Sequence, residues 1–505
     1  RYCAGMCMLR WGNSVALLAV GAGAAAAPVH NANATRLQEH GVETAWLYGN
    51  INHYAYYFAD IMVGSPKPQR TSVIVDTGSR LVGFPCKGCD HCGSHLDPQF
   101  DVSLSTSATW LNCSRNHCSK GCQNGYCSYE ETYSEGSTIS GRWFDDKVRL
   151  GDSFEDNKPV YANLGCHTNE NKLFYTQRAN GIMGLAPSYE GSDGRPTFLQ
   201  DLFRDKRHVD AQIFSICLAD WGGRLTVGGY DTAYHREADM HAPGHCSKRR
   251  PCTGDGVQWI DMTASHYYFI FPQGMSLAGQ PVASGPRDFG VTVVDSGTTF
   301  TYLPLPIFQS IVAHLTHYCA DHNGCGANQE PVAGSGLQGP GAHCWRLINP
   351  AEGPIHFPPI TFQFARGVSV DWDSRGYLHQ RGQPGVWCQT FMQNSLFQTV
   401  LGISWMIHRD IIFDIKHGQL GVASANCPEH HKNADSEGHN VPLSAKLLQD
   451  GWNDLNGSSS GRASEALGVT IAFAGAAGFA IAFWLLPRQF QEGGKEGSSS
   501  CPPSP

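Results

Sequence analysis

The chain has 505 residues, of which 41% are hydrophobic and 16% are charged. This composition is typical of a globular protein and excludes a wholly disordered one, and the length exceeds that of one ordinary domain. The formal net charge of −8 leaves no basic stripe, so we expect no nucleic acid among its partners.

The N-terminal region, residues 1–27, carries the pattern of a secretory signal peptide. Arg10 precedes an apolar run over residues 15–27, and this run ends in small residues suited to cleavage. A short core helix is the alternative interpretation. A signal peptide would place the following chain in an oxidising compartment.

Short β-rich runs dominate residues 46–427 and indicate a mainly β protein. They alternate or run apolar for a few residues and are bounded by Gly, Pro, Asp or Asn. The clearest runs are residues 53–64, 71–78, 142–151, 223–231, 266–279, 291–297 and 411–424.

Helical periodicity is scarce, and residues 305–319 are the best candidate for a helix. The apolar face of this helix would be Ile307, Ile311, Leu315 and Tyr318. Residues 324–344 follow as a Gly/Pro-rich segment with a cysteine near each end. We expect a surface loop closed by a disulfide between these two cysteines.

The chain contains one motif twice. "SVIVDTGSRLVGFP" begins at Ser72 and "VTVVDSGTTFTYLP" begins at Val291; each has an aliphatic run, then Asp, hydroxyl residue, Gly and hydroxyl residue. Two apolar residues and a glycine recur later in each half, at residues 182–184 and 400–402. This repetition predicts two similar lobes that each donate one aspartate at a pseudo-twofold axis.

Asp76 and Asp295 are therefore the candidate catalytic residues. Two carboxylates held close together cannot both ionise readily, so they share one proton. The ionised partner can act as general base on a water molecule, while the protonated partner donates to the carbonyl oxygen under attack. This chemistry needs no metal and no cofactor, and we predict neither.

The neighbours of each aspartate are expected to support the dyad. They are Thr77, Gly78 and Ser79 in the first motif and Ser296, Gly297 and Thr298 in the second. The glycines allow a tight turn. The outer hydroxyl of each motif can donate to its own carboxylate, and the inner hydroxyls can bond across the axis. A single Asp-Ser-Gly is more often an ordinary turn, so the duplication carries the prediction.

Nineteen cysteines point to a disulfide-rich protein. Sixteen lie between the signal peptide and the C-terminal apolar segment described below, which allows up to eight disulfides in an oxidising compartment. Seven follow the first Asp motif: Cys86, Cys89, Cys92, Cys113, Cys118, Cys122 and Cys127. A zinc site with His91, His95 and His117 is the alternative for this segment. Sequons at Asn33, Asn112 and Asn456 fit the same compartment.

On these motifs, residues 46–427 resemble the pepsin-like aspartic proteases. The cysteine-rich segment resembles the insert of nepenthesin-like enzymes, and the layout is similar to that of the membrane-anchored plasmepsin V-type enzymes of apicomplexan parasites. The resemblance implies a bilobal pepsin-like fold with lobes at residues 28–232 and 233–427. It also implies an aspartic endopeptidase, a hydrolase, with a monomeric catalytic unit.

The resemblance extends to a flap hairpin in "ETYSEGSTISG". Tyr133 matches the flap tyrosine, and Glu135 and Gln177 match polar residues that would bind the arginine of an Arg-x-Leu substrate motif. Since most hairpin-tip acids are solvated, a plain surface charge is the alternative for Glu135.

Three positions depart from the pattern of these families. Gly83 replaces a tryptophan that hydrogen-bonds the flap tyrosine, so Tyr133 must find another partner or move more freely. Ser134 replaces a cysteine of the plasmepsin V type. Arg80 replaces a serine, and the sequence offers no physical account of it.

The C-terminal region predicts a membrane anchor. Residues 428–465 are polar and Ser/Gly/Asn-rich, which suits a flexible stalk. Residues 466–486 contain no charge and are long enough to cross a bilayer. Residues 487–505 would then be a cytosolic tail, which makes a type I protein. A glycolipid-anchor signal is the alternative, but the polar tail argues against it.

The expected function is processing of secretory or exported proteins in the endoplasmic reticulum or Golgi, with proteins and peptides as substrates. Two alternatives remain. One is a broad-specificity acidic protease of a vacuole-like or lysosome-like compartment. The other is a non-catalytic binding protein on the pepsin fold, which would be expected to lose an aspartate or its hydroxyl neighbours.

Overall fold

The computed structural model describes residues 41–430 except 115–117, 119, 153–156, 188–194, 205–207, 237–255, 331–342 and 381–383. The signal peptide, most of the stalk, the membrane helix and the tail predicted above lie outside these residues. Among the helices that are described, none combines the length and the apolar character needed to span a bilayer. The lobe limits predicted from the sequence stay a prediction.

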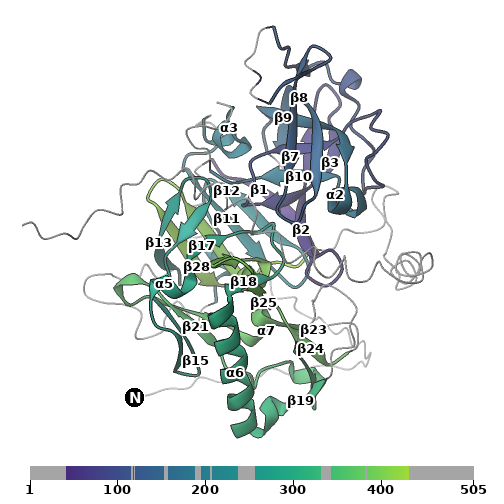
Figure 1. Ribbon diagram of the computed structural model, residues 1–505. Coiled ribbons are helices and arrows are strands. Elements are labelled where there is room, and N and C mark those ends of the chain that lie inside the picture. The colour runs from purple at the N-terminus through teal and green to yellow at the C-terminus, as the bar shows by residue number, and fades with distance from the viewer. Residues whose placement is uncertain are drawn as a thin grey trace, which may run out of the picture.

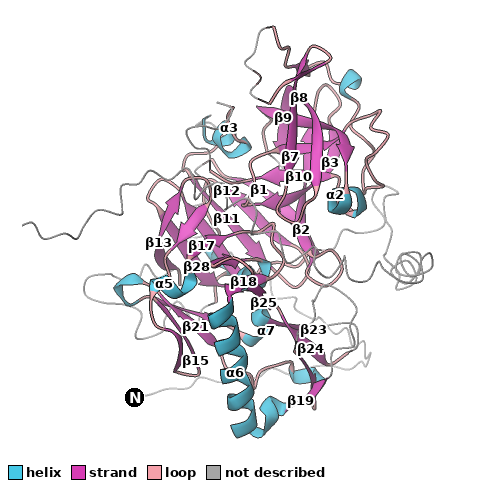
Figure 2. Ribbon diagram, viewed as in Figure 1, coloured by secondary structure: helices cyan, strands magenta, loops and turns pink. Residues whose placement is uncertain are grey.

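The protein is mainly β and bilobal, as Figures 1 and 2 show. The strands of the N-terminal half are β1 (Glu43–Asn50), β2 (Tyr56–Val63), β3 (Gln69–Asp76), β4 (Val82–Pro85), β5 (Thr109–Trp110), β6 (Cys122–Gln123), β7 (Tyr126–Thr132), β8 (Thr138–Leu150), β9 (Val160–Glu170), β10 (Gly181–Gly184), β11 (Ile213–Leu218) and β12 (Gly223–Val227). Its helices are α2 (Lys172–Thr176) and α3 (Phe198–Arg204).

The C-terminal half repeats this β-rich character. Its strands are β13 (Gln258–Ala264), β14 (Tyr268–Ile270), β15 (Gly274–Leu277), β16 (Gln280–Ala283), β17 (Val291–Val294), β18 (Thr301–Pro304), β19 (Ala327–Glu330), β20 (Cys344–Leu347), β21 (Ile360–Gln363), β22 (Ser369–Trp372), β23 (Leu378–Gln380), β24 (Val386–Gln389), β25 (Phe391–Asn394), β26 (Gln398–Leu401), β27 (Arg409–Asp414) and β28 (Gln419–Ser424). Its helices are α5 (Pro286–Phe289), α6 (Leu305–Asp321), α7 (Ser374–Tyr377) and α8 (Ile403–Met406).

Helix α6 confirms the one helix predicted from periodicity, and it extends two residues beyond the predicted end. Ile307, Ile311 and Leu315 are buried, as the apolar face requires, and Cys319 is buried one turn further on. Tyr318 is only partly buried and packs at the edge of the core. The proline in the first turn suits a helix start, where its missing N–H costs no hydrogen bond.

The two halves share one strand arrangement, which explains the duplicated motif. In the first half, β10 lies parallel to β3 and antiparallel to β4, and it pairs Gly184 with Asp76. In the second half, β26 lies parallel to β17 and antiparallel to β18, and it pairs Leu401 with Val294. The later apolar-apolar-Gly segments are therefore the strands that hold the Asp strands in place.

An antiparallel sheet connects the lobes through the middle of the molecule. Its strands lie in the order β1, β12, β11, β27, β28 and β13. Cys217 of β11 forms a disulfide with Cys427, which ties the end of the C-terminal half to the N-terminal half. One large cluster of buried apolar residues contains residues of both lobes, and a smaller cluster lies in the N-terminal lobe.

The disulfide expected to close residues 324–344 is wrong. Cys325 bonds Cys319, and Cys344 bonds Cys388. After α6 the chain turns through left-handed backbone conformations at Asn323 and Cys325, which folds the second cysteine back onto the helix end. Cys344 lies opposite Cys388 in the β20–β24 pairing, so its partner is fixed by sheet register.

Candidate active site

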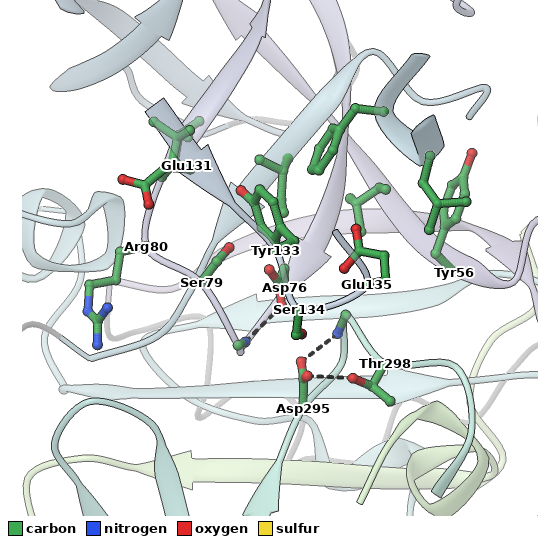
Figure 3. A pocket seen from close by; sticks show the side chains of 18 of the residues that line it. Tyr56, Asp76, Ser79, Arg80, Glu131, Tyr133, Ser134, Glu135, Asp295 and Thr298 are labelled. Carbon is green, nitrogen blue, oxygen red and sulfur yellow. Dashed lines mark hydrogen bonds between the residues drawn. The ribbon is translucent and has the colours of Figure 1, made fainter. Parts of the chain in front are cut away.

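The two aspartates lie where the two equivalent strands end, as Figure 3 shows. The N–H of Leu185 donates to the main-chain oxygen of Asp76 at 2.7 Å, and the N–H of Asp295 donates to that of Leu401 at 3.0 Å. Both bonds join an Asp loop to its parallel neighbour strand. The fold therefore fixes each aspartate by its own lobe.

A buried set of four hydrogen bonds joins the two Asp loops across the axis. Thr77 N–H donates to Ser296 Oγ at 3.0 Å, and Ser296 N–H donates to Thr77 Oγ1 at 2.9 Å. The two hydroxyls donate onward to the opposite strands, Thr77 to the carbonyl of Val294 at 3.1 Å and Ser296 to that of Val75 at 2.8 Å. These bonds hold the loops at a fixed separation.

The two glycines allow the carboxylates to approach each other. A Cβ atom on Gly297 would lie 2.3 Å from Oδ1 of Asp76, and one on Gly78 would lie 2.7 Å from Oδ1 of Asp295. No larger residue fits either position without moving a carboxylate. Each glycine N–H also donates to the aspartate of its own loop, at 2.8 Å for Gly78 and 2.9 Å for Gly297.

The outer hydroxyls differ between the two loops. Thr298 donates to Oδ2 of Asp295 at 2.6 Å. The hydroxyl oxygen of Ser79 is buried, and among the described residues it makes no hydrogen bond with normal geometry. Asp295 is also the more exposed of the two carboxylates, whereas the side chain of Asp76 is buried.

The surroundings of Asp76 favour its protonated form. Burial raises the pKa of the Asp76 carboxyl well above its usual range, and the nearby negative charge of Asp295 raises it further. The Gly78 N–H and the nearby Ser79 hydroxyl oppose this shift without reversing it. The two aspartates thus differ, since burial favours a proton on Asp76, while Asp295 accepts hydrogen bonds from Gly297 and Thr298.

Tyr133 lies in the hairpin between β7 and β8, over the two aspartates (Figure 3). The hairpin closes with a bond from the Tyr133 N–H to the Ser137 carbonyl at 2.8 Å. The Tyr133 hydroxyl is buried and lies near the Ser79 hydroxyl, but it makes no hydrogen bond of normal geometry among the described residues. Burial raises its pKa well above the usual range, so the phenol stays protonated.

The space left by Gly83 is occupied from the neighbouring strand. A Cβ atom on Gly83 would lie 2.6 Å from Nε2 of His167, so the imidazole fills the position. The ring of Tyr133 packs instead against Phe174 of α2, with ring centroids 4.8 Å apart. Ring packing, rather than a hydrogen bond, therefore holds the flap tyrosine in this state.

Glu131 and Glu135 lie on the flap on opposite sides of Tyr133 (Figure 3). Glu131 lies in β7, whereas Tyr133 and Glu135 lie in the turn that follows this strand, and all three residues line the cleft. Burial raises the pKa of Glu135, and hydrogen bonds at Ser137 lower it. Glu131 forms an ion pair with Lys120. Gln177, which follows α2, lines the same cleft as Glu135.

The cleft that contains these residues has a volume of about 850 Å³. It is lined by the dyad, the flap, α2 and aromatic residues, and its charged lining residues besides the dyad are Arg80, Lys120, Glu131, Glu135, Arg178 and Arg195. Its size suits several residues of an extended peptide.

The cysteine-rich segment is built by disulfides. The bonds within it are Cys89–Cys92, Cys113–Cys122 and Cys118–Cys127, and Cys86 bonds Cys166 of β9. The sulfur atoms of Cys113, Cys118 and Cys127 lie within 4.8 Å of one another because they belong to two adjacent disulfides. His91 and His95 contact protein oxygens, and His117 lies outside the described residues.

The structure gives Arg80 a physical role that the sequence did not reveal. Its Nε donates to the carbonyl of Pro187 at 2.9 Å, and its Nη2 donates to the carbonyl of His266 at 2.5 Å. Arg80 thus joins the first Asp loop to the C-terminal lobe at the end of the cleft away from Glu135 (Figure 3). The sequence also did not reveal that Glu131 lines the cleft, although its position two residues before Tyr133 could have indicated this.

Comparison with known proteins defines the class of this chain. Residues 56–425 match the family model of the eukaryotic aspartyl proteases. The chain therefore belongs to this family, whose members are endopeptidases.

Three individual proteins of known name are similar to this chain. The chain is similar to Aspartic protease 5 of Toxoplasma gondii, with 33% identity over 420 residues, 76% of this chain and 38% of the relative. It is similar to Plasmepsin V of Plasmodium falciparum, with 27% identity over 446 residues, 76% of this chain and 73% of the relative. It also resembles Aspartic proteinase nepenthesin-2 of Nepenthes gracilis, at 25% identity over 64% of this chain and 73% of the relative. The chain thus spans less than half the length of Aspartic protease 5.

Proposed function

We propose that this protein is an aspartic endopeptidase whose catalytic pair is Asp76 and Asp295. The observation that carries the proposal is the pair of cross-bonded loops, which presents two facing carboxylates with unequal surroundings beneath a tyrosine-bearing flap. A binding protein would have no need of this arrangement.

The unequal surroundings assign a role to each aspartate. Asp295, as the carboxylate, takes a proton from a water molecule held between the pair, and the water oxygen bonds to the peptide carbonyl carbon. Asp76 gives its proton to the carbonyl oxygen, which becomes a hydroxyl of the tetrahedral intermediate. When the C–N bond breaks, the amine leaves with the proton that Asp295 took, and the intermediate returns its hydroxyl proton to Asp76.

We propose that the substrates carry an Arg-x-Leu-type motif upstream of the cleaved bond. Glu135 faces the cleft in a largely buried position, where a carboxylate binds a guanidinium by charge-assisted hydrogen bonds. Gln177 lines the same cleft and adds an amide. The similarity to Plasmepsin V supports this choice of substrate.

The proposed setting is the membrane of the secretory pathway, in the endoplasmic reticulum or Golgi. Seven disulfides among the described residues fit an oxidising compartment. The apolar segment 466–486 would anchor the protein as a type I single-pass protein with a lumenal catalytic unit.

The test uses the full-length protein and one peptide with Arg-x-Leu, together with its Arg→Lys and Leu→Ala twins. We expect cleavage after Leu, and a loss of kcat/KM when either residue is changed. Equal cleavage of all three peptides would remove the Arg-x-Leu specificity, and no cleavage of any would overturn the protease assignment.

Glu131 supplies a matched control for Glu135, because both are flap carboxylates that line the cleft. Glu135→Gln should lower kcat/KM by about 10- to 100-fold on the Arg peptide, the scale of a charge-assisted hydrogen bond, and should have little effect on the Lys twin. Glu131→Gln should not show this selective loss. An equal loss on both peptides in Glu135→Gln would mean that Glu135 serves the flap and not substrate recognition.

A further inference from the structure

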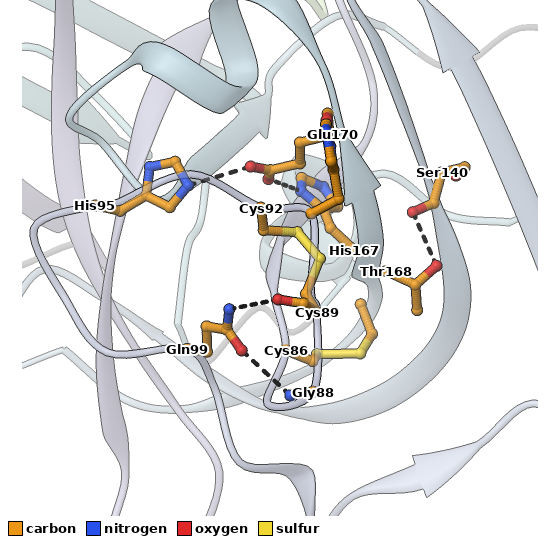
Figure 4. Close-up of a disulfide and its surroundings, with 12 residues drawn as sticks. Cys86, Gly88, Cys89, Cys92, His95, Gln99, Ser140, His167, Thr168 and Glu170 are labelled. Carbon is orange, nitrogen blue, oxygen red and sulfur yellow. Dashed lines mark hydrogen bonds and ion pairs between the residues drawn. A yellow bond between two sulfur atoms is a disulfide. The ribbon is translucent and has the colours of Figure 1, made fainter.

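Figure 4 shows a carboxylate, that of Glu170, between two histidines, His95 and His167. The Glu170 side chain is fully buried. Its Oε1 lies 2.6 Å from Nδ1 of His167, and its Oε2 lies 3.1 Å from Nε2 of His95. His95 comes from the cysteine-rich segment, three residues after Cys92 of the Cys89–Cys92 disulfide, whereas Glu170 and His167 belong to β9.

Both ring nitrogens of His95 face hydrogen-bond acceptors. Nε2 faces the Glu170 carboxylate, and Nδ1 lies 3.0 Å from the main-chain oxygen of Gln177. A neutral imidazole carries one N–H and cannot donate to both acceptors, whereas the imidazolium can. The geometry around His95 therefore calls for a proton on each nitrogen.

The charges of the cluster agree with this assignment. Burial raises the pKa of Glu170, but the hydrogen bonds from His167 and His95 outweigh burial and leave it below its usual range. Glu170 is thus ionised, and a buried anion requires a cation beside it. His167 faces one acceptor, and its Nε2 is buried without a partner among the described residues, so the neutral form of His167 suffices. The positive charge belongs on His95.

We propose that His95 is a positioning residue for the substrate cleft, which as a buried imidazolium holds the main chain of Gln177 to the disulfide-closed loop behind it. This inference rests on the proposed function of the cleft. It adds that substrate binding depends on the protonation of a histidine that does not itself touch the substrate.

The segment that His95 holds is part of the cleft wall. Gln177 lines the cleft, and its N–H donates to the carbonyl of Leu173, which caps α2. The next residue, Arg178, accepts a bond from the N–H of Leu96 at 2.8 Å. The Tyr56 hydroxyl accepts from the Arg178 N–H at 2.9 Å. His95 and Leu96 on one side and Tyr56 on the other therefore fix this wall.

The same wall supports the flap. The N–H of Leu173 donates to Oγ of Ser137 at 3.3 Å, and the side-chain oxygen of Asn171 accepts from the N–H of Thr138 at 2.7 Å. Phe174 packs against the ring of Tyr133. A displacement of the chain at Gln177 would therefore also shift α2, and with it the flap that α2 contacts.

Few other charges act on His95 directly. On its own segment, Nδ1 of His91 faces the main-chain oxygen of Glu170 at 2.7 Å, and Asp97 is engaged by Arg70 of β3 at 2.8 Å. On the opposite elements, Glu170 and His167 of β9 and Arg178 after α2 are the ionisable groups. Glu170 is the one carboxylate among the described residues that bonds His95.

Loss of the proton has a definite consequence. The remaining N–H stays with Glu170, because a bond to an ionised group is the stronger one. The lone pair on Nδ1 then faces the Gln177 carbonyl, and the cleft wall loses the hydrogen bond between His95 and Gln177. As pH rises, KM for the Arg peptide should therefore increase while kcat changes less.

The direct test measures protonation and needs no activity. The full-length protein is labelled with ¹⁵N-histidine, and the His95 signals are assigned by their loss in His95→Gln. At neutral pH both His95 nitrogens should resonate as protonated nitrogens. One protonated and one unprotonated nitrogen would overturn the proposal, even if the protein proves to be an active protease.

Kinetics test the link to the cleft, with His91→Gln as the matched control, since His91 is an exposed histidine of the same loop whose ring contacts the main-chain oxygen of Glu170 and the ring of Tyr175 but not Gln177. His95→Gln should raise KM about tenfold at neutral pH, the scale of one lost hydrogen bond, with kcat changed less and the pH dependence of KM removed. His95→Asn, which can keep a donor near Gln177, should restore part of the loss. Unchanged KM in His95→Gln, or an equal change in His91→Gln, would overturn the positioning role.

If no peptide is cleaved, the proposed function fails, and the ¹⁵N measurement still decides the protonation state of His95.

Discussion

The two Asp loops have nearly the same sequence and the same strand arrangement, yet their surroundings differ. Asp295 is partly exposed and accepts bonds from both Gly297 and Thr298. Asp76 is buried, accepts a bond from Gly78 and lies under the flap. The backbone of the site is therefore symmetric, while its protonation is not.

This difference shows which part of the fold makes the surroundings of the two aspartates unequal. The cross-axis bonds of Thr77 and Ser296 treat both lobes alike. The flap comes from the N-terminal lobe and covers Asp76 with an aromatic ring, which removes water from one carboxyl and not from the other. Unequal burial raises the pKa of Asp76, which is the basis of the different roles proposed for the two aspartates.

The largest expected effect is the loss of catalysis when either aspartate is neutralised. Asp76→Asn and Asp295→Asn should each lower kcat by at least about 10³-fold, because each removes one half of a general acid–base pair. Circular dichroism and thermal unfolding would show that both variants remain folded. Activity retained in either variant would break the comparison, since the two loops would then not act as one site.

The cross-axis bonds should dominate the stability of the site. Thr77→Val and Ser296→Ala should each lower the free energy of unfolding by about 1–3 kcal/mol, because each leaves buried groups without partners. The two effects should be non-additive, by about 0.5–3 kcal/mol in a double-mutant cycle.

Ser79→Ala is the control for these variants, because its hydroxyl makes no hydrogen bond of normal geometry among the described residues. Denaturant unfolding should show a small change for this variant. Additive effects of Thr77→Val and Ser296→Ala, or an equal loss in Ser79→Ala, would mean that the loops are held by other contacts.

The smallest expected effect concerns the flap tyrosine. Tyr133→Phe should change the free energy of unfolding by less than about 0.5 kcal/mol, because it keeps the ring that packs on Phe174 and removes a hydroxyl without a partner among the described residues. Tyr133→Ala should cost more, since it removes the ring. A large loss in Tyr133→Phe would show that the hydroxyl is bonded in solution.

Much of this arrangement could be predicted from the sequence because it repeats. The two Asp motifs and the two later apolar-apolar-Gly segments predicted two similar lobes that each donate one aspartate, and periodicity predicted α6. These patterns are formed by residues close together in the sequence, so they can be recognised without knowledge of the fold.

The remaining features depend on contacts between distant segments. Cys325 bonds back to Cys319 because of a left-handed turn that spacing does not reveal. His167 fills the space beside Gly83, and Arg80 reaches carbonyls of residues far along the chain. No local pattern marks such partners, which is why the prediction for residues 324–344 failed and why Arg80 had no account.

The most direct measurement is kcat/KM for the Arg-x-Leu peptide between about pH 4 and pH 9, near the ordinary range of carboxyls and well beyond it. The proposed mechanism requires a protonated Asp76, so activity should fall at high pH when Asp76 loses its proton. Because the pKa of Asp76 lies above its usual range, activity should persist at neutral pH. Activity confined to below about pH 5 would contradict a raised pKa at Asp76, because an ordinary aspartate has already lost its proton above that pH, and would favour an acidic degradative protease.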